Sequence, residues 1–199
     1  MSQVKSSSQG WKIESFSSVE RVEIDWVFHS YVARGKITAL FGEPGCGKSL
    51  ITLDWAARFS TGRGWPDGTP PLQRTGKVLI FATEDDAGDT ILPRFIAAGG
   101  NPENLLRIHL EGDTGFYFDD PKHLEVLRMV TEQNRDIGMV IIDPIFEHMR
   151  ADKEQATREA YAKAGILQNV NRPRLSCCIS LVKTSCAAAV TMALVISAR

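Results

Sequence analysis

Apolar side chains fill most positions of three short stretches of the chain, residues 36–41, 77–83 and 139–142. Strands that are covered on both faces show such continuous runs rather than strict alternation. Two further runs, 175–182 and 190–196, have the same character. The pattern therefore predicts a mostly parallel sheet built from these strands.

Between these strands, apolar residues recur at helical spacing. One predicted helix follows 36–41, ends near Gly62, and carries a set of apolar side chains: Leu50, Ile51, Leu53, Trp55, Ala56, Ala57 and Phe59. Further helices are predicted around 91–96, over 121–134 and over 152–168. Strands that alternate with helices predict an α/β fold.

The connecting segments allow more than one interpretation. Partial alternation over 19–31 predicts an edge strand or an approach segment, and 104–110 predicts another short strand. The Gly- and Pro-rich connection 62–76 is either a surface loop near a nucleotide base or a partner, or a plain solvated connection. The aromatic run within 111–121 could stack on bases, but we favour packing in the local core.

Composition narrows the class of protein. The chain has 199 residues, of which 43% are hydrophobic and 24% charged, as in a soluble globular protein of roughly one domain. A Ser-rich stretch predicts a flexible tail over 1–18, which leaves 19–199 as the domain. The net charge of −1 excludes an overall basic field, so a nucleic-acid site would have to be a local patch or arise on assembly.

The cysteines and the hydropathy pattern indicate the cellular compartment of the protein. Cys46 lies in a glycine-rich loop, while Cys177, Cys178 and Cys186 lack the spacing of a zinc site, so reduced thiols are expected. The N-terminus is polar rather than a signal peptide, and the longest apolar run, 187–196, is too short to span a bilayer. We therefore predict a cytoplasmic protein without a membrane segment.

The strongest chemical signal lies between the first apolar run and the first helix. The stretch from Gly42 to Ser49 reads G-x-x-x-x-G-K-S, the Walker A phosphate-binding motif. Its glycines bring backbone N–H groups to the phosphates, Lys48 reaches the β- and γ-phosphates, and the Ser49 hydroxyl binds Mg²⁺. A Gly-rich turn that binds nothing is disfavoured by the flanking strand and helix. The predicted nucleotide contacts are Gly42, Glu43, Pro44, Gly45, Cys46, Gly47, Lys48, Ser49 and Leu50.

Three carboxylates, Glu84, Asp85 and Asp86, follow the second apolar run. Ligands of open α/β sheets bind beyond the carboxyl ends of the strands, so this cluster is expected at the same edge as the phosphate loop. A solvated cap is the alternative, since Asp85 or Asp86 could begin the next helix. We favour a functional Glu84 and a helix-capping Asp86.

The third apolar run ends in Asp143, which gives the Walker B pattern of four apolar residues followed by Asp. Such a strand carries its carboxylate to Mg²⁺, often through a water in the metal's shell. Any buried strand can end in Asp, so the motif is weak alone. Asp143 follows Lys48 in the chain with another strand–helix unit between them. The Walker A and Walker B motifs in this order are together much stronger evidence of a nucleotide site than either alone.

Together these motifs resemble the RecA-like ATPases of the plasmid RepA replicative-helicase type, within the wider group of AAA-family ATPases. The resemblance spans about 19–150 and rests on four blocks in the family's order. The first block is 34–36 together with the Walker A loop, and the second is 60–63 together with Pro66. The third is 83–86 together with Thr90, Pro93 and Arg94, and the fourth is 141–144.

The resemblance implies a RecA-like P-loop domain with helices on both faces of a mostly parallel sheet. It implies ATP and Mg²⁺ as cofactors, with Glu84 and Lys48 as catalytic residues, Glu84 orienting the attacking water, and Ser49 and Asp143 at the metal. The expected activity is ATP hydrolysis by a helicase-like motor in DNA replication or recombination. Single-stranded DNA and identical subunits in a ring are the expected partners.

The C-terminal third departs from this family. Members carry a strand that ends in His, followed by a short basic stretch that senses the nucleotide. Here 181–183 resembles the basic part, but Ser180 stands at the position of the His. The usual Gly/Ser-rich segment is replaced by 186–189, and the terminal Arg199 is a poor candidate for an arginine finger. We expect an incomplete C-terminal part, through truncation or a changed reading frame.

Two other functions remain open from the sequence. A nucleotide switch or regulatory ATPase that binds a protein partner would need no basic DNA footprint. A small-molecule kinase is disfavoured, since such enzymes bring an Arg-rich lid and the connection 62–76 contains only Arg63 and Arg74.

Overall fold

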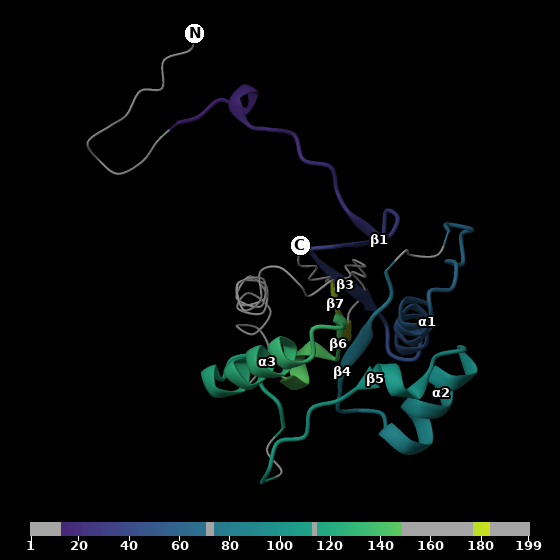
Figure 1. Cartoon of the computed structure of the whole chain (residues 1–199). Coiled ribbons are helices and arrows are strands. Elements are labelled where there is room, and N and C mark those ends of the chain that lie inside the picture. Colours follow the sequence, from purple (N-terminus) through teal and green to yellow (C-terminus); the bar gives the residue numbers. More distant parts are fainter. Residues whose placement is uncertain (1–12, 71–73, 113–114, 149–176, 184–199) are drawn as a thin grey trace.

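The computed structural model describes residues 13–70, 74–112, 115–148 and 177–183 (Figure 1). Within these ranges, five parallel strands form the central sheet: β3 (Ile37–Gly42), β4 (Lys77–Ala82), β5 (Leu105–Leu106), β6 (Ile137–Asp143) and β7 (Cys177–Lys183). Their order in space is β3-β7-β6-β4-β5, so β7 separates the strand of the phosphate loop from β6. The predicted α/β fold with a parallel sheet is confirmed for the described residues.

Helices cover both faces of this sheet (Figure 1). One face packs against α1 (Lys48–Thr61) and α2 (Leu92–Ala97), which a π-helical turn (Ala87–Ile91) precedes, and the other packs against α3 (Pro121–Gln133). Successive residues of β4 alternate between two hydrophobic cores, Val78 and Ile80 on the α1 side and Leu79 and Phe81 on the α3 side. This is why the strand is apolar at every inner position.

The ends of the two longer helices follow their capping residues. Gly62 ends α1 at a φ of 71° and donates its N–H to the Arg58 carbonyl oxygen at 2.8 Å, as a left-handed glycine does at a C-cap. Asp120 begins α3 by accepting a hydrogen bond from the Lys122 N–H, with Pro121 in the first turn. Both boundaries agree with the predicted helices.

A short antiparallel hairpin packs beside α1. It consists of β1 (Trp26–Phe28) and β2 (Val32–Ala33). The Phe28 ring stacks on Trp65 at a centroid distance of 4.4 Å and meets Trp55 of α1 edge-on at 5.6 Å. Three 3₁₀ turns complete the described elements: η1 (Phe16–Ser18), η3 (Pro102–Asn104) and η4 (Ile145–His148).

Two predicted strands are much shorter than expected. Of the segment 19–31, only Trp26–Phe28 is a strand, and Val22 and Ile24 are exposed instead of facing a core. Of 104–110, only β5 pairs with the sheet, through Val78 and Leu79 of β4. A segment whose apolar and polar side chains alternate becomes a β-strand only where a neighbouring strand is available for backbone hydrogen bonds.

The prediction for the first turn of α1 is wrong in part. Leu50 and Ile51 are exposed, because Thr52, Leu53 and Ala56 form the inner face of the helix. By contrast, Phe116 and Phe118 are buried in the α3-side core, as expected for the aromatic run. Met129 of α3 is apolar and yet exposed.

Several predictions lie outside the described residues. They concern most of the tail 1–18, the helix 152–168, the strand 190–196 and Arg199. The strand predicted over 175–182 corresponds to β7, which pairs in parallel with both β3 and β6. No helix in the described part of the chain combines the length and the apolar character that a membrane crossing needs.

Candidate nucleotide site

The loop between β3 and α1 has the backbone that an anion site requires. Gly45 and Gly47 have φ angles of 78° and 87°, a region that favours glycine. Among the described residues, no atom outside their chain neighbours lies within 4 Å of a Cβ built at either position, so backbone conformation rather than space calls for these glycines. Gly47 is the N-cap of α1 and offers no side chain to the N–H groups of the first turn. Those N–H groups and the positive end of the helix dipole are thus available to an anion.

Lys48 lies across this loop. Its side chain is only 7% exposed, and its ammonium group donates hydrogen bonds to the carbonyl oxygens of Gly42 and Glu43, at 2.7 Å each. The Sγ atom of Cys46 is 3.6 Å from the same nitrogen. Residues 43–46 themselves are exposed. The loop therefore holds one buried cation beneath an open turn of backbone.

Strand register brings the other predicted residues to the same edge of the sheet. Ala82, the last residue of β4, pairs with Asp143 of β6, and the Thr83 N–H donates to the Asp143 carbonyl oxygen at 3.4 Å. Ser49, Glu84 and Asp143 all line one cavity of about 10 Å³. That volume is close to the space that one water molecule occupies.

The three carboxylates after β4 have different surroundings. Asp86 accepts hydrogen bonds from the N–H groups of Gly88 and Asp89, at 2.7 and 3.0 Å, and caps the helical turn. These backbone bonds, from Asp89 first, lower the pKa of Asp86. Asp85 forms an ion pair of 2.8 Å with Arg94. The predicted cap at Asp86 is confirmed, while Glu84 is exposed and lines the cavity together with Ser49 and Asp143.

One family model, described as an AAA domain, matches residues 4–182. The chain belongs to the AAA domain family. This is a family of P-loop ATPases, so the predicted P-loop and the general nucleotide-binding class are confirmed for this AAA domain, and ATPase activity is a general property of the family. The RepA-like type stays a prediction. No curated protein matches the chain.

The side chains of this AAA domain suit a Mg²⁺–nucleotide complex. Among the described residues, no group of three or more His, Cys, Asp and Glu side chains is placed to hold a metal ion by itself. Mg²⁺ in nucleotide sites needs no such cage, since one or two protein oxygens join water and phosphate oxygens around it. Ser49 and Asp143, on the wall of one cavity, are a fitting pair for that role.

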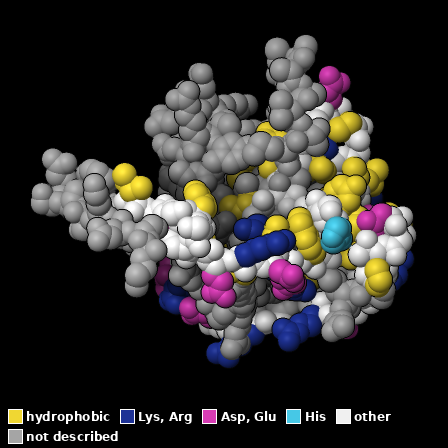
Figure 2. All heavy atoms as spheres, turned by 90° about the horizontal axis from the view of Figure 1, so that it is seen from above, with side chains coloured by type: hydrophobic (Ala, Val, Ile, Leu, Met, Phe, Trp, Pro, Cys, Tyr) yellow, Lys and Arg dark blue, Asp and Glu magenta, His cyan; other side chains and the backbone are white. Residues whose placement is uncertain are grey.

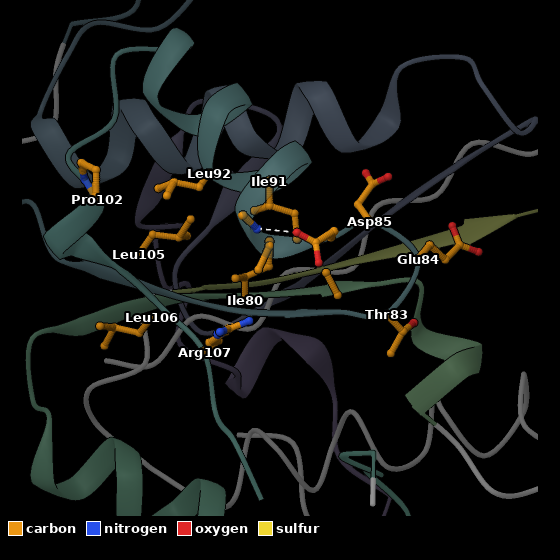
Figure 3. Close-up of a pocket in the computed structure, with 14 residues that line it drawn as sticks. Ile80, Thr83, Glu84, Asp85, Ile91, Leu92, Pro102, Leu105, Leu106 and Arg107 are labelled. Atoms are coloured by element: carbon orange, nitrogen blue, oxygen red, sulfur yellow. Dashed lines mark hydrogen bonds between the residues drawn. The ribbon is translucent and has the colours of Figure 1, made fainter. Parts of the chain in front are cut away.

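A larger cavity of about 650 Å³ adjoins the small one (Figure 3). Glu84 and Asp85 line both cavities. In Figure 3, Leu105, Leu106 and Arg107 lie on one side of the larger cavity, and Glu84 and Asp85 lie on the other. The AAA domain thus has a second hollow whose wall includes the predicted catalytic glutamate.

Two charged or titratable residues, Arg107 in the larger cavity and His148 in the α3-side core, belong to none of the sequence motifs. Arg107 follows β5, so the rule that selected Glu84 at the end of β4 would also have selected it. His148 is buried, and its Nδ1 donates to the Phe116 carbonyl oxygen at 2.8 Å. Burial lowers the pKa of His148 below its ordinary value. Its sequence position carries no signal of this burial.

Proposed function

We propose that this AAA domain binds MgATP at residues 42–50 and hydrolyses it. The observation that carries the proposal is the meeting of Ser49, Glu84 and Asp143 on one cavity wall beside the Walker A loop. These residues come from three separate segments of the chain. A plain Gly-rich turn would not require a hydroxyl from the start of α1 and two carboxylates from the ends of β4 and β6 at one point.

The proposed roles follow from the position of each group. N–H groups of the loop and the first turn of α1 bind phosphate oxygens, and the Lys48 ammonium exchanges its carbonyl partners for them. Mg²⁺ bridges phosphate oxygens and offsets their charge, with Ser49 and Asp143 holding it directly or through water. Glu84 accepts a hydrogen bond from the attacking water and orients it toward the terminal phosphate.

We further propose that the domain acts as a RecA-like, helicase-like motor of the RepA type in DNA replication or recombination. The four sequence blocks in the order of that family support this assignment. Single-stranded DNA would be bound by an assembly of identical subunits, where Lys and Arg side chains from several copies line one channel. A single copy has a net charge of only −1, so the assembly must provide the basic surface.

A regulatory ATPase that binds a protein partner is the second candidate. On the face shown in Figure 2, the coloured Lys and Arg side chains are interspersed with Asp and Glu and with hydrophobic side chains. Mixed surfaces of this kind suit protein partners better than a phosphate backbone, which needs clustered positive charge. The nucleotide site would be the same in both cases.

ATP turnover with and without single-stranded DNA separates these functions. A motor predicts turnover that rises strongly when a single-stranded oligonucleotide is added, and an effect that falls as the salt concentration rises. An ATP turnover rate that stays the same when DNA is added supports the regulatory ATPase. Turnover that requires a small-molecule acceptor would instead indicate a kinase. If MgATP does not bind at all, the proposal for the site itself is wrong.

A further inference from the structure

The 650 Å³ cavity beside Glu84 has the size and the lining of a small-molecule site (Figure 3). Such sites typically measure about 300–1,000 Å³ and combine apolar walls with a few polar groups. Its apolar lining residues are Ile80, Ala82, Ile91, Leu92, Pro102, Leu105 and Leu106. Transfer of an apolar group from water to such walls is favourable. The cavity can therefore take up the apolar part of a small molecule.

Two opposite charges on the cavity wall, Asp86 and Arg107, lie near each other without pairing. Hydrogen bonds from the N–H groups of Asp89 and Gly88 lower the pKa of Asp86, and the positive charge of Arg107 adds to this effect. The two side chains are thus within electrostatic range. Among the described residues, however, the Arg107 guanidinium forms no ion pair and no hydrogen bond. A ligand can therefore use this cation.

The Asp86 carboxylate also has an oxygen to offer. The N–H groups of Gly88 and Asp89 both donate to Oδ1, and no donor in the described part of the chain bonds to Oδ2. Asp85 differs, because its carboxylate is already paired with Arg94 at 2.8 Å. The wall thus presents one cation and one carboxylate oxygen, close to each other and to apolar side chains.

We propose that this cavity binds a free α-amino acid with an apolar side chain. The carboxylate of the amino acid pairs with Arg107, and its ammonium group donates to Oδ2 of Asp86. Its side chain packs among Leu92, Leu105 and Leu106. An α-amino acid carries both of its charges next to one carbon atom, so it suits two protein charges that are neighbours but are not joined. A ligand with only one of these charges would lose one of the two contacts.

The bound amino acid would also lie beside Glu84, which lines the same cavity. An ammonium group near a carboxylate stabilises its charged form and so makes it a weaker proton acceptor. Occupation of the cavity should therefore slow a hydrolysis that relies on Glu84. This regulatory effect rests on the proposed function, whereas binding of the amino acid does not.

Calorimetric titration of the full chain tests the choice of ligand. The probes are L-phenylalanine and L-leucine, and the comparison compounds are phenethylamine, which lacks the carboxylate, and hydrocinnamate, which lacks the ammonium group. We expect phenylalanine to bind about threefold to tenfold more tightly than either comparison compound, since each loses one exposed ion pair. The absence of binding by both amino acids, or equal affinities for phenylalanine and the comparison compounds, would overturn the proposal.

Two substitutions test the assignment of each charge. Arg107→Gln should weaken the binding of hydrocinnamate by about threefold or more and leave that of phenethylamine unchanged. Asp86→Asn should do the reverse, and asparagine still offers an oxygen to cap the helical turn. The matched control is Arg135→Gln, at an exposed site outside the cavity wall. Losses of affinity that do not depend on the charge of the ligand would contradict the assigned pairing.

A third substitution tests the place of the side chain. Leu92 lines the cavity and is 37% exposed, so the larger side chain of Leu92→Trp should fill the cavity and weaken phenylalanine binding by about tenfold or more. Ile96→Trp is the matched control, because Ile96 is a 51% exposed residue of the same helix outside the cavity wall. Circular dichroism verifies that both variants are folded. Wild-type affinity in Leu92→Trp would overturn the proposal.

Nucleotide binding separates the two proposals. A wild-type chain that binds phenylalanine but no fluorescent ATP analogue would refute the proposed function and leave the amino-acid site standing. A chain that binds the ATP analogue but neither amino acid would do the reverse. Where both ligands bind, we expect ATP turnover to fall by about twofold or more at saturating phenylalanine. Turnover that stays the same would contradict the regulatory effect.

Discussion

The Lys48 ammonium group lies 2.7 Å from the carbonyl oxygen of Gly42 and donates a hydrogen bond to it. Neutral carbonyl oxygens therefore hold this buried cation beneath the phosphate loop. A phosphate oxygen carries negative charge and is a stronger acceptor than a carbonyl. Phosphate can thus replace Gly42 as the partner of Lys48 with little movement of the loop.

Removal of this cation should weaken nucleotide binding. A hydrogen bond to a charged group contributes about 1.5–3 kcal/mol, so Lys48→Ala should raise the Kd for MgATP by about 10- to 150-fold. Titration with a fluorescent ATP analogue measures this change. Lys122→Ala, an exposed lysine of α3, is the matched control and should leave the Kd unchanged. Equal affinities for Lys48→Ala and the wild type would show that the loop does not hold the phosphates.

Stability should be sensitive to the glycine before β4. A Cβ at Gly76 would lie 2.6 Å from the carbonyl oxygen of Asp136, which is held in place by the Lys77 N–H at 2.7 Å. Overpacking of this kind costs about 1–3 kcal/mol, so Gly76→Ala should lower the free energy of unfolding by that amount. Urea denaturation measures it.

Gly88→Ala is the control for this prediction. Its added Cβ would approach the Asp86 carboxylate no closer than 3.4 Å, an ordinary contact. Its free energy of unfolding should stay close to that of the wild type. If both variants unfold at the same urea concentration, the close approach at Gly76 does not limit stability.

Acid should destabilise the fold through His148. Burial lowers the pKa of this imidazole in the folded state, so the unfolded chain binds its proton at a higher pH. The free energy of unfolding should therefore fall as the pH drops below about 6.5, and this loss should level off below the folded pKa. His148→Phe removes the titrating group and should flatten the pH dependence between pH 7.5 and 5.5. Parallel pH profiles for wild type and variant in urea denaturation would refute this role.

Local patterns predicted most of the elements around the site. The run 77–83 became β4, Gly62 ended α1, and Asp86 became a cap, because each depends on interactions within a few residues. The convergence of Ser49, Glu84 and Asp143 was also predictable, since parallel strands deliver their carboxyl ends to one edge of a sheet.

Features that depend on distant partners were not predictable. Val22 and Ile24 alternate like strand residues but have no neighbouring strand to pair with. Leu50 looked like a core residue, yet the orientation of α1 is set by its packing on the sheet. The cavity beside Arg107 forms between β4, β5 and the π-helical turn, and no local pattern encodes such a space.

The most direct measurement of the proposed activity is ATP binding and turnover by Glu84→Gln. Glutamine keeps the size of the side chain but accepts a proton poorly, so the variant should bind MgATP like the wild type and hydrolyse it about 10²-fold or more slowly. Glu103→Gln, an exposed site in η3, should match the wild type in both. Wild-type turnover in Glu84→Gln would contradict the proposed hydrolytic site. It would show that Glu84 follows the end of a strand without a role in catalysis.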